Sequence, residues 1–299
     1  MNTTHSDWLE TAWNGIRFRR PPHWEITRIG NQDLLLADEE GPVLEIKWGP
    51  ASGTFSHDAL LKRLALKHRL HGPPGFSAIP VPEEWVQGLR RFRLSGFEWR
   101  DGTTGGRGVI FDCPRCSKAG LIQFIHRPNR NHFPDISSNG ISTTLLASFR
   151  DHSEDGRNLF ALYDIRLVVP EAFRLHSYRF TAGAFELHFR HRRISLTFYR
   201  WGLAGLRLAG NDLALFGRKI FAVTNPVTQE NRSATEESVE WRLAAPPWWS
   251  RLISKAPFQQ CRLRYIESRD RILGVRITGK QPINDGIFRQ LTQDFTLVP

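Results

Sequence analysis

The sequence is poor in cysteine and has no long apolar run. Its 299 residues contain three cysteines and one methionine. Three cysteines are too few for the disulfide framework of a small secreted protein, and residues 1–8 lack the pattern of a signal peptide. No stretch approaches the roughly 18 consecutive apolar residues of a spanning helix. These absences predict a cytoplasmic protein without a transmembrane segment.

Catalytic motifs are missing as well. The chain has no Gly-x-Ser-x-Gly, no His-Glu-x-x-His, no phosphate-binding loop and no kinase signature. The glycine-rich residues 102–108 precede a predicted strand, so they indicate a hairpin loop. The polar residues 151–155 fall on a predicted domain linker, where such residues are ordinary. The sequence therefore predicts a protein that is not an enzyme, with a site between two domains as the alternative.

The chain carries a large excess of positive charge. Its formal net charge is +11 and its pI is about 10.2. Such an excess favours encounter with nucleic acids, acidic proteins or anionic surfaces. It does not locate a binding site.

The most informative feature is an internal repeat. Residues 15–26 align without gaps on residues 164–175, and Trp48-Gly49 recurs as Trp201-Gly202. Each repeated unit is as large as a domain rather than a solenoid repeat. The sequence therefore predicts two similar domains from an internal duplication, over residues 1–157 and 158–299.

Short alternating runs separated by turn residues predict strands joined by tight turns, and such neighbours pair antiparallel. The expected fold class is therefore α+β, with each domain a mainly antiparallel sheet packed with helices. We expect helices over 56–70, 141–149, 204–216 and 287–295. The expected strands cover 16–19, 24–29, 34–37, 43–48, 89–94, 108–112, 120–125, 165–169, 173–178, 185–189, 194–199, 239–243, 262–266 and 273–277.

A proline step after the first strand of each half supports a family resemblance. The runs Arg20–Trp24 and Val169–Phe173, together with the order of elements, resemble the Mog1/PsbP-like fold, an α/β/α sandwich. The resemblance implies tandem domains of this type. Proteins of that fold mostly act as binding or accessory proteins, so it also implies a non-catalytic role. It carries over no catalytic residue and no specific partner.

The pair Cys113 and Cys116 forms a Cys-x-x-Cys turn typical of a zinc knuckle. Zinc requires four ligands, and no second such pair exists. The nearest histidine, His126, is expected about 20 Å away at the far end of a strand. A dimer, or a loop bringing in His132, would have to complete the shell. We therefore expect a tight turn without a cofactor, with zinc as the alternative.

Pairs of arginines alternate with apolar residues on three predicted strands. If these strands are neighbours, the open sheet face would suit phosphate groups. The alternative is a solvated face, or one neutralised by carboxylates. The candidate residues for polyanion binding are Arg17, Arg19, Arg91, Arg93, Arg262 and Arg264.

The segment 246–256 predicts a short helix opened by proline. Trp248, Trp249, Leu252 and Ile253 lie on one face of this helix, which predicts either a partner-docking surface or a cover for a sheet edge. The leading hypothesis is a protein-interaction (adaptor or accessory) protein with another protein as its partner. The alternative is salt-sensitive binding of nucleic acid or another polyanion. Pathway and oligomeric state stay open.

Overall fold

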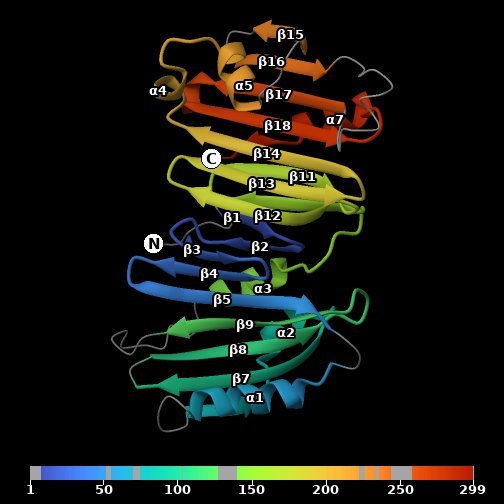
Figure 1. Cartoon of the computed structure of the whole chain (residues 1–299). Coiled ribbons are helices and arrows are strands. Elements are labelled where there is room, and N and C mark those ends of the chain that lie inside the picture. Colours follow the sequence, from blue (N-terminus) through green and yellow to red (C-terminus); the bar gives the residue numbers. More distant parts are fainter. Residues whose placement is uncertain are drawn as a thin grey trace. The chain divides into compact units, whose positions relative to one another are not determined.

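The computed structural model describes residues 8–51, 55–69, 75–102, 104–126, 140–221, 226–232, 236–243 and 258–298. The chain divides into two compact units. The first contains the residues up to Asp155 together with Ala161–Tyr163, and the second contains Gly156–Phe160 and the residues from Asp164 onward. Each unit is a mainly antiparallel sheet with helices, which confirms the predicted α+β class (Figure 1). Among the described residues, no helix is long and apolar enough to cross a membrane.

The first unit is built around a seven-stranded antiparallel sheet of order β3-β4-β5-β9-β8-β7-β6. Its strands are β3 (Glu25–Gly30), β4 (Asp33–Asp38), β5 (Gly41–Pro50), β6 (Gly75–Ile79), β7 (Arg93–Asp101), β8 (Thr104–Asp112) and β9 (Lys118–His126). The helices are α1 (His57–Arg69), α2 (Glu83–Gly88) and α3 (Ile141–Ser148). A separate hairpin joins β1 (Leu9–Trp13) to β2 (Ile16–Arg20).

Helices cover both faces of this first sheet. Helix α1 lies along β6 and β7 on one face (Figure 1). On the other face, the rings of Phe92, Phe111 and Phe149 pack with centroids 5.2–5.7 Å apart. On this same face, the ring of Trp85 in α2 lies 5.4 Å from that of Phe124 in β9. These buried aromatic rings hold α2 and the end of α3 against the sheet.

The second unit has a sheet of the same size and strand order, β12-β13-β14-β18-β17-β16-β15. Its strands are β12 (Arg174–Thr181), β13 (Ala184–His191), β14 (Ile194–Gly202), β15 (Pro226–Arg232), β16 (Glu236–Leu243), β17 (Phe258–Ile266) and β18 (Arg271–Gly279). The helices are α4 (Ala204–Leu208), α5 (Leu213–Phe221) and α7 (Asp285–Gln293), with a short η2 (Glu267–Arg269). Strand β10 (Arg157–Leu162) precedes β11 (Ile165–Pro170), and β11 pairs with β19 (Thr296–Leu297). The two sheets share one topology, and the duplication stays a prediction.

Two layers of aromatic side chains hold the second sheet. Helix α5 packs against β16 and β17, where Gly217 faces Trp241 so closely that an added Cβ would meet the indole at 2.1 Å. On β14, the ring of Phe198 lies 5.2 Å from that of Phe295, which follows the C-cap residue Asp294 of α7. The predicted closing helix over 287–295 is thus present, at Asp285–Gln293.

Two predicted elements differ from the structure. The expected strand 89–94 begins only at Arg93, because Leu89 and Phe92 belong to turns after α2 and are buried in the core. The expected helix 204–216 is broken into α4 and α5. Ala209 and Gly210 adopt left-handed φ values of 48° and 82°, which no helix accommodates.

Candidate functional site

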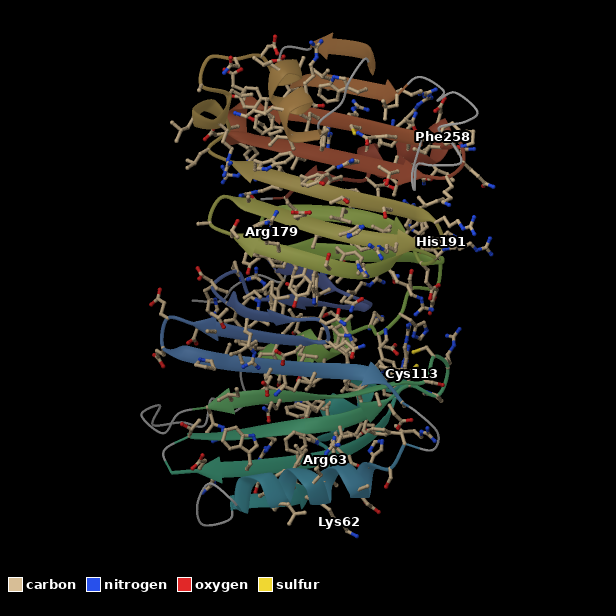
Figure 2. All side chains as sticks on the ribbon, in the orientation of Figure 1. Lys62, Arg63, Cys113, Arg179, His191 and Phe258 are labelled. Atoms are coloured by element: carbon tan, nitrogen blue, oxygen red, sulfur yellow. The ribbon has the colours of Figure 1, made fainter. Side chains whose placement is uncertain are left out.

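The Cys-Pro-Arg-Cys segment forms the tip of the hairpin between β8 and β9, as predicted. Figure 2 labels Cys113 at this end of the first unit's sheet. The Cys113 amide donates a hydrogen bond to the Lys118 carbonyl at 2.8 Å, which closes the turn. Ser117 adopts a left-handed φ of 52° within the turn. The turn therefore has the backbone form of a metal-binding knuckle.

Two further side chains converge on these thiols. The Cys116 thiol donates to Asp151 Oδ2 at 2.8 Å, and Cys113 Sγ lies 3.9 Å from His152 Nδ1. His152 Nδ1 also lies 2.8 Å from Asp151 Oδ1. One ligand atom from each of the four residues lies within 4.8 Å of the others. Asp151 and His152, which the sequence assigns to a domain linker, thus belong to a cluster of four possible metal ligands.

The cluster formed by Cys113, Cys116, Asp151 and His152 is partly buried and lies close to the Lys118 ammonium. Cys113 and Asp151 are buried, His152 is half-buried and Cys116 is exposed. Burial raises the pKa of the Cys116 thiol to about 12, and the nearby Asp151 carboxylate acts in the same direction. The Lys118 ammonium donates to the carbonyl oxygens of Asp151 and Gly15. The four side chains together offer two sulfurs, one imidazole nitrogen and one carboxylate to a metal ion.

A basic pocket lies between β2 and α3 in the same unit. Its volume is about 680 Å³, and Arg17, Arg19 and Arg150 line it together with Glu10 and Phe18. Arg17 and Arg19 are exposed while their neighbours Ile16 and Phe18 are buried, so the predicted alternation holds in β2. The Arg19 amide donates to Ser148 Oγ in α3 at 2.8 Å. The pocket therefore presents guanidinium groups to solvent beside a helix end.

Positive charges crowd at this pocket. Burial lowers the pKa of Arg150, and the nearby charges of Arg91 and Arg17 lower it further. The Glu154 carboxylate opposes them and pairs with Arg91 at 3.3 Å. Three of the arginines predicted to bind polyanions, Arg17, Arg19 and Arg91, thus lie around Arg150. The sequence pattern did not single out Arg150.

The other predicted arginines do not join them. One continuous arginine face would require β2, β7 and β17 to be neighbours, and these strands belong to three different sheets. Arg93 pairs with the buried Asp112. Arg262 lies 3.5 Å from Thr292 Oγ1 of α7, and the mostly buried Arg264 donates to the Phe295 carbonyl. Packing against α7 therefore closes the sheet face that bears Arg262 and Arg264.

Two predicted features lie outside the described residues. These are the candidate docking residues Trp248, Trp249, Leu252 and Ile253, and the candidate loop ligand His132.

A chain of hydrogen bonds ties the start of α1 to the sheet. His57 Nδ1 lies 2.8 Å from Ser95 Oγ, and its Nε2 lies 2.7 Å from Asp112 Oδ1. The same residue types form nucleophilic triads, in which the carboxylate stabilises an imidazolium. Here Arg93 already neutralises that carboxylate. We therefore interpret the chain as an anchor for α1.

A larger hollow of about 770 Å³ opens under α1, over β5 and β9. Glu45, which lines this hollow, has its charge compensated by neighbouring side chains. Burial alone would raise the pKa of Glu45, but Lys47, Arg28 and Gln123 bond it and hold its pKa below the usual range. The remaining lining is mainly apolar, including Trp48. The Glu45 carboxylate is therefore already paired within the hollow.

The chain matches no protein-family model and no curated protein sequence. It is similar in structure to the Ran-binding protein Mog1p of Saccharomyces cerevisiae, with 12% identity over 48% of this chain and 95% of that one, at a TM-score of 0.32. Cyanobacterial PsbP from Synechocystis sp. PCC 6803 is 9% identical over 51% of this chain and 96% of that one, at a TM-score of 0.33. The immunity protein TplEi of Pseudomonas aeruginosa is 9% identical over 97% of both chains, at a TM-score of 0.36. Mog1 and PsbP proteins are thus among the solved structures to which this chain is similar.

Proposed function

We propose that the protein is a non-catalytic interaction protein that binds an acidic segment of a partner protein. The pocket between β2 and α3 supports this proposal. It exposes Arg17 and Arg19 beside Arg150 in a volume of about 680 Å³, which suits a short run of carboxylate side chains. Guanidinium groups bind carboxylates through paired hydrogen bonds, so this lining matches an acidic segment in charge and chemistry.

The concentration of positive charge at the pocket favours the binding of an anion. The guanidinium of Arg150 is partly buried, and the positive charges of Arg91 and Arg17 act on it. An incoming carboxylate would lower the electrostatic free energy of all three groups. Charges at the rim of such a site mainly speed association and select the partner.

A protein segment fits the pocket better than a nucleic acid does. Backbone-led nucleic-acid binding needs a continuous basic surface that follows many phosphates. Among the described residues, five of the predicted arginines are divided among three sheets and Arg91 lies in a turn. Arg93 and Arg264 are taken up by contacts within their units. The pocket also contains an acidic residue, Glu10, and the aromatic side chain of Trp8. Such a mixed lining is typical of a peptide site.

Affinity purification of the full chain from its own host at low salt tests this proposal. We would compare the wild-type protein with the double variant Arg17→Gln, Arg19→Gln. The matched control is Arg174→Gln, Arg193→Gln, which removes two exposed arginines from the second unit. We expect one protein in stoichiometric amount with wild type and control, and its loss with the pocket variant.

Two outcomes would contradict the proposal. The first is a bound protein that all three forms retain equally, which would place the interface outside the pocket. The second is nucleic acid that co-elutes with wild type and leaves with salt, which would favour the polyanion alternative. Digestion of the eluate with nuclease separates that case from a protein partner that nucleic acid merely bridges.

A further inference from the structure

We propose that Cys113, Cys116, Asp151 and His152 form a binding site for one zinc ion. The site goes beyond the proposed interaction function and does not depend on it. The two thiolates come from the β8–β9 hairpin, and the carboxylate and imidazole come from the segment that follows α3. All four ligands belong to one chain, so the site needs neither a dimer nor a distant loop.

The separations between the donor atoms suit a tetrahedral ion. Zinc bonds are about 2.3 Å to sulfur and about 2.0–2.2 Å to nitrogen or oxygen, so donors at tetrahedral angles lie about 3.3–3.8 Å apart. In the structure, the four donor atoms already lie within 4.8 Å of one another. The Cys113 Sγ to His152 Nδ1 distance is 3.9 Å. Binding an ion therefore requires small side-chain movements, which include a widening of the 2.8 Å contact between Cys116 Sγ and Asp151 Oδ2.

The backbone holds each pair of ligands in place. Hydrogen bonds within the hairpin and the left-handed Ser117, at a φ of 52°, keep both sulfurs on one side of the turn. The Cys113 amide donates to the Lys118 carbonyl at 2.8 Å and closes the turn. On the other side, the main chains of Arg17 and Arg150 exchange hydrogen bonds of 2.9 and 2.8 Å immediately before Asp151. The ligands are therefore positioned by two independent parts of the unit.

The chemistry of the set selects zinc. Two soft sulfurs with one imidazole favour zinc over magnesium or calcium, which prefer oxygen ligands. Two thiolates and one carboxylate around a divalent ion leave one net negative charge. The Lys118 ammonium, which contacts the Asp151 carbonyl, lies close enough to offset this charge. Four protein ligands close the shell, so the ion would be structural and would clamp the hairpin to the segment after α3.

Metal analysis of the full chain tests the site. We would purify the protein without a polyhistidine tag under reducing conditions and measure bound zinc by mass spectrometry. We would then remove the metal with a chelator and titrate the protein with Co²⁺. We expect one zinc per chain and, with cobalt, a tetrahedral spectrum with thiolate charge-transfer bands. A reduced protein that retains no zinc, or that gives an octahedral cobalt spectrum, would overturn the proposal.

Single variants assign the ligands. We expect Cys116→Ser, Asp151→Asn and His152→Ala each to weaken zinc binding by more than the roughly 10- to 100-fold that loss of an outer hydrogen-bond partner costs. Glu154→Gln and His176→Ala are the matched controls, because both remove an exposed residue of the same type outside the site. Full zinc affinity in both Asp151→Asn and His152→Ala would overturn the four-ligand assignment. The wild-type cobalt spectrum decides the geometry even for a variant that fails to fold.

Discussion

Arg17 and Arg150 pair through their main chains, each donating its amide to the carbonyl of the other at 2.9 and 2.8 Å. This pair connects the two candidate sites of the first unit. Arg17 belongs to the basic pocket, and Arg150 directly precedes two of the four clustered ligands, Asp151 and His152. Binding of a ligand at either site should therefore affect the backbone of the other site, because a short stretch of main chain joins them.

Removing zinc should loosen this backbone pair. The ion would hold Asp151 and His152, so its loss would free the segment that carries the Arg150 amide. We expect the amides of Arg17 and Arg150 to exchange with deuterium faster after chelation, with no change in strands of the second unit. Hydrogen-exchange mass spectrometry of the zinc-loaded and chelated protein measures this. Equal exchange in both forms would show that the metal does not control the pocket.

Neutralising the pocket arginines should weaken binding of an acidic probe without loss of stability. Arg17 and Arg19 are exposed, so Arg17→Gln, Arg19→Gln should change the free energy of unfolding by less than about 0.5 kcal/mol. We expect a labelled glutamate-rich peptide to bind this variant at least about tenfold more weakly than wild type. Fluorescence anisotropy at several salt concentrations measures the affinity for the peptide. The variant Arg174→Gln, Arg193→Gln should bind the peptide as wild type does.

Removing His57 should destabilise the first unit. Its ring bonds Ser95 and the buried Asp112, so His57→Ala leaves both without that partner. We expect a loss of about 1–3 kcal/mol in the free energy of unfolding. The exposed His23 provides a control, since His23→Ala should have little effect. Urea denaturation measures the free energy of unfolding of both variants. If His57→Ala lost no more stability than His23→Ala, the anchoring role of His57 would be refuted.

Acid should weaken the second unit through Asp164. Burial alone would raise the pKa of this carboxyl, but hydrogen bonds and charges from Arg200 and Arg271 outweigh it and hold the pKa below the usual range. A carboxyl with a lowered folded-state pKa stabilises the protein above its unfolded-state pKa of about 4. That stability is lost as the pH falls from about 4 through the folded-state pKa.

We expect Asp164→Asn to reduce stability at pH 7 and to flatten its decline below about pH 4. Thermal unfolding across this pH range measures the effect. Glu171→Gln removes an exposed carboxylate of the same unit and serves as the control. If the stability of Asp164→Asn fell below about pH 4 as steeply as that of wild type, this ion pair would not determine the pH dependence.

A methyl group at Gly217 should disrupt the packing of α5. An added Cβ would meet the Trp241 ring at 2.1 Å and the Leu263 side chain at 2.8 Å. We expect Gly217→Ala to cost about 1–3 kcal/mol through overpacking, despite the higher helix propensity of alanine. At Gly205 in α4 the nearest atom lies at 3.6 Å, so Gly205→Ala should be neutral or stabilising. Thermal denaturation of the two variants measures the difference.

Prediction from sequence succeeded where the chemistry is local. The alternation of residues 16–19 identified β2 and the exposure of Arg17 and Arg19, and the spacing of Cys113 and Cys116 identified the knuckle turn. It failed where a local pattern had two interpretations. The run 89–94 alternates like a strand, yet Leu89 and Phe92 turn into the core because α2 precedes them.

The sequence by itself determined the α+β class, most of the elements and the excess of positive charge, because periodicity and turn residues act over a few neighbours. Only the tertiary structure decided which distant residues meet. Cys116 and Asp151 come within 2.8 Å although 35 positions separate them, and Arg262 lies 3.5 Å from Thr292 of α7. The physical reason is that periodicity assigns a residue to a face of its own element. The order of strands and the packing of helices determine what that face contacts.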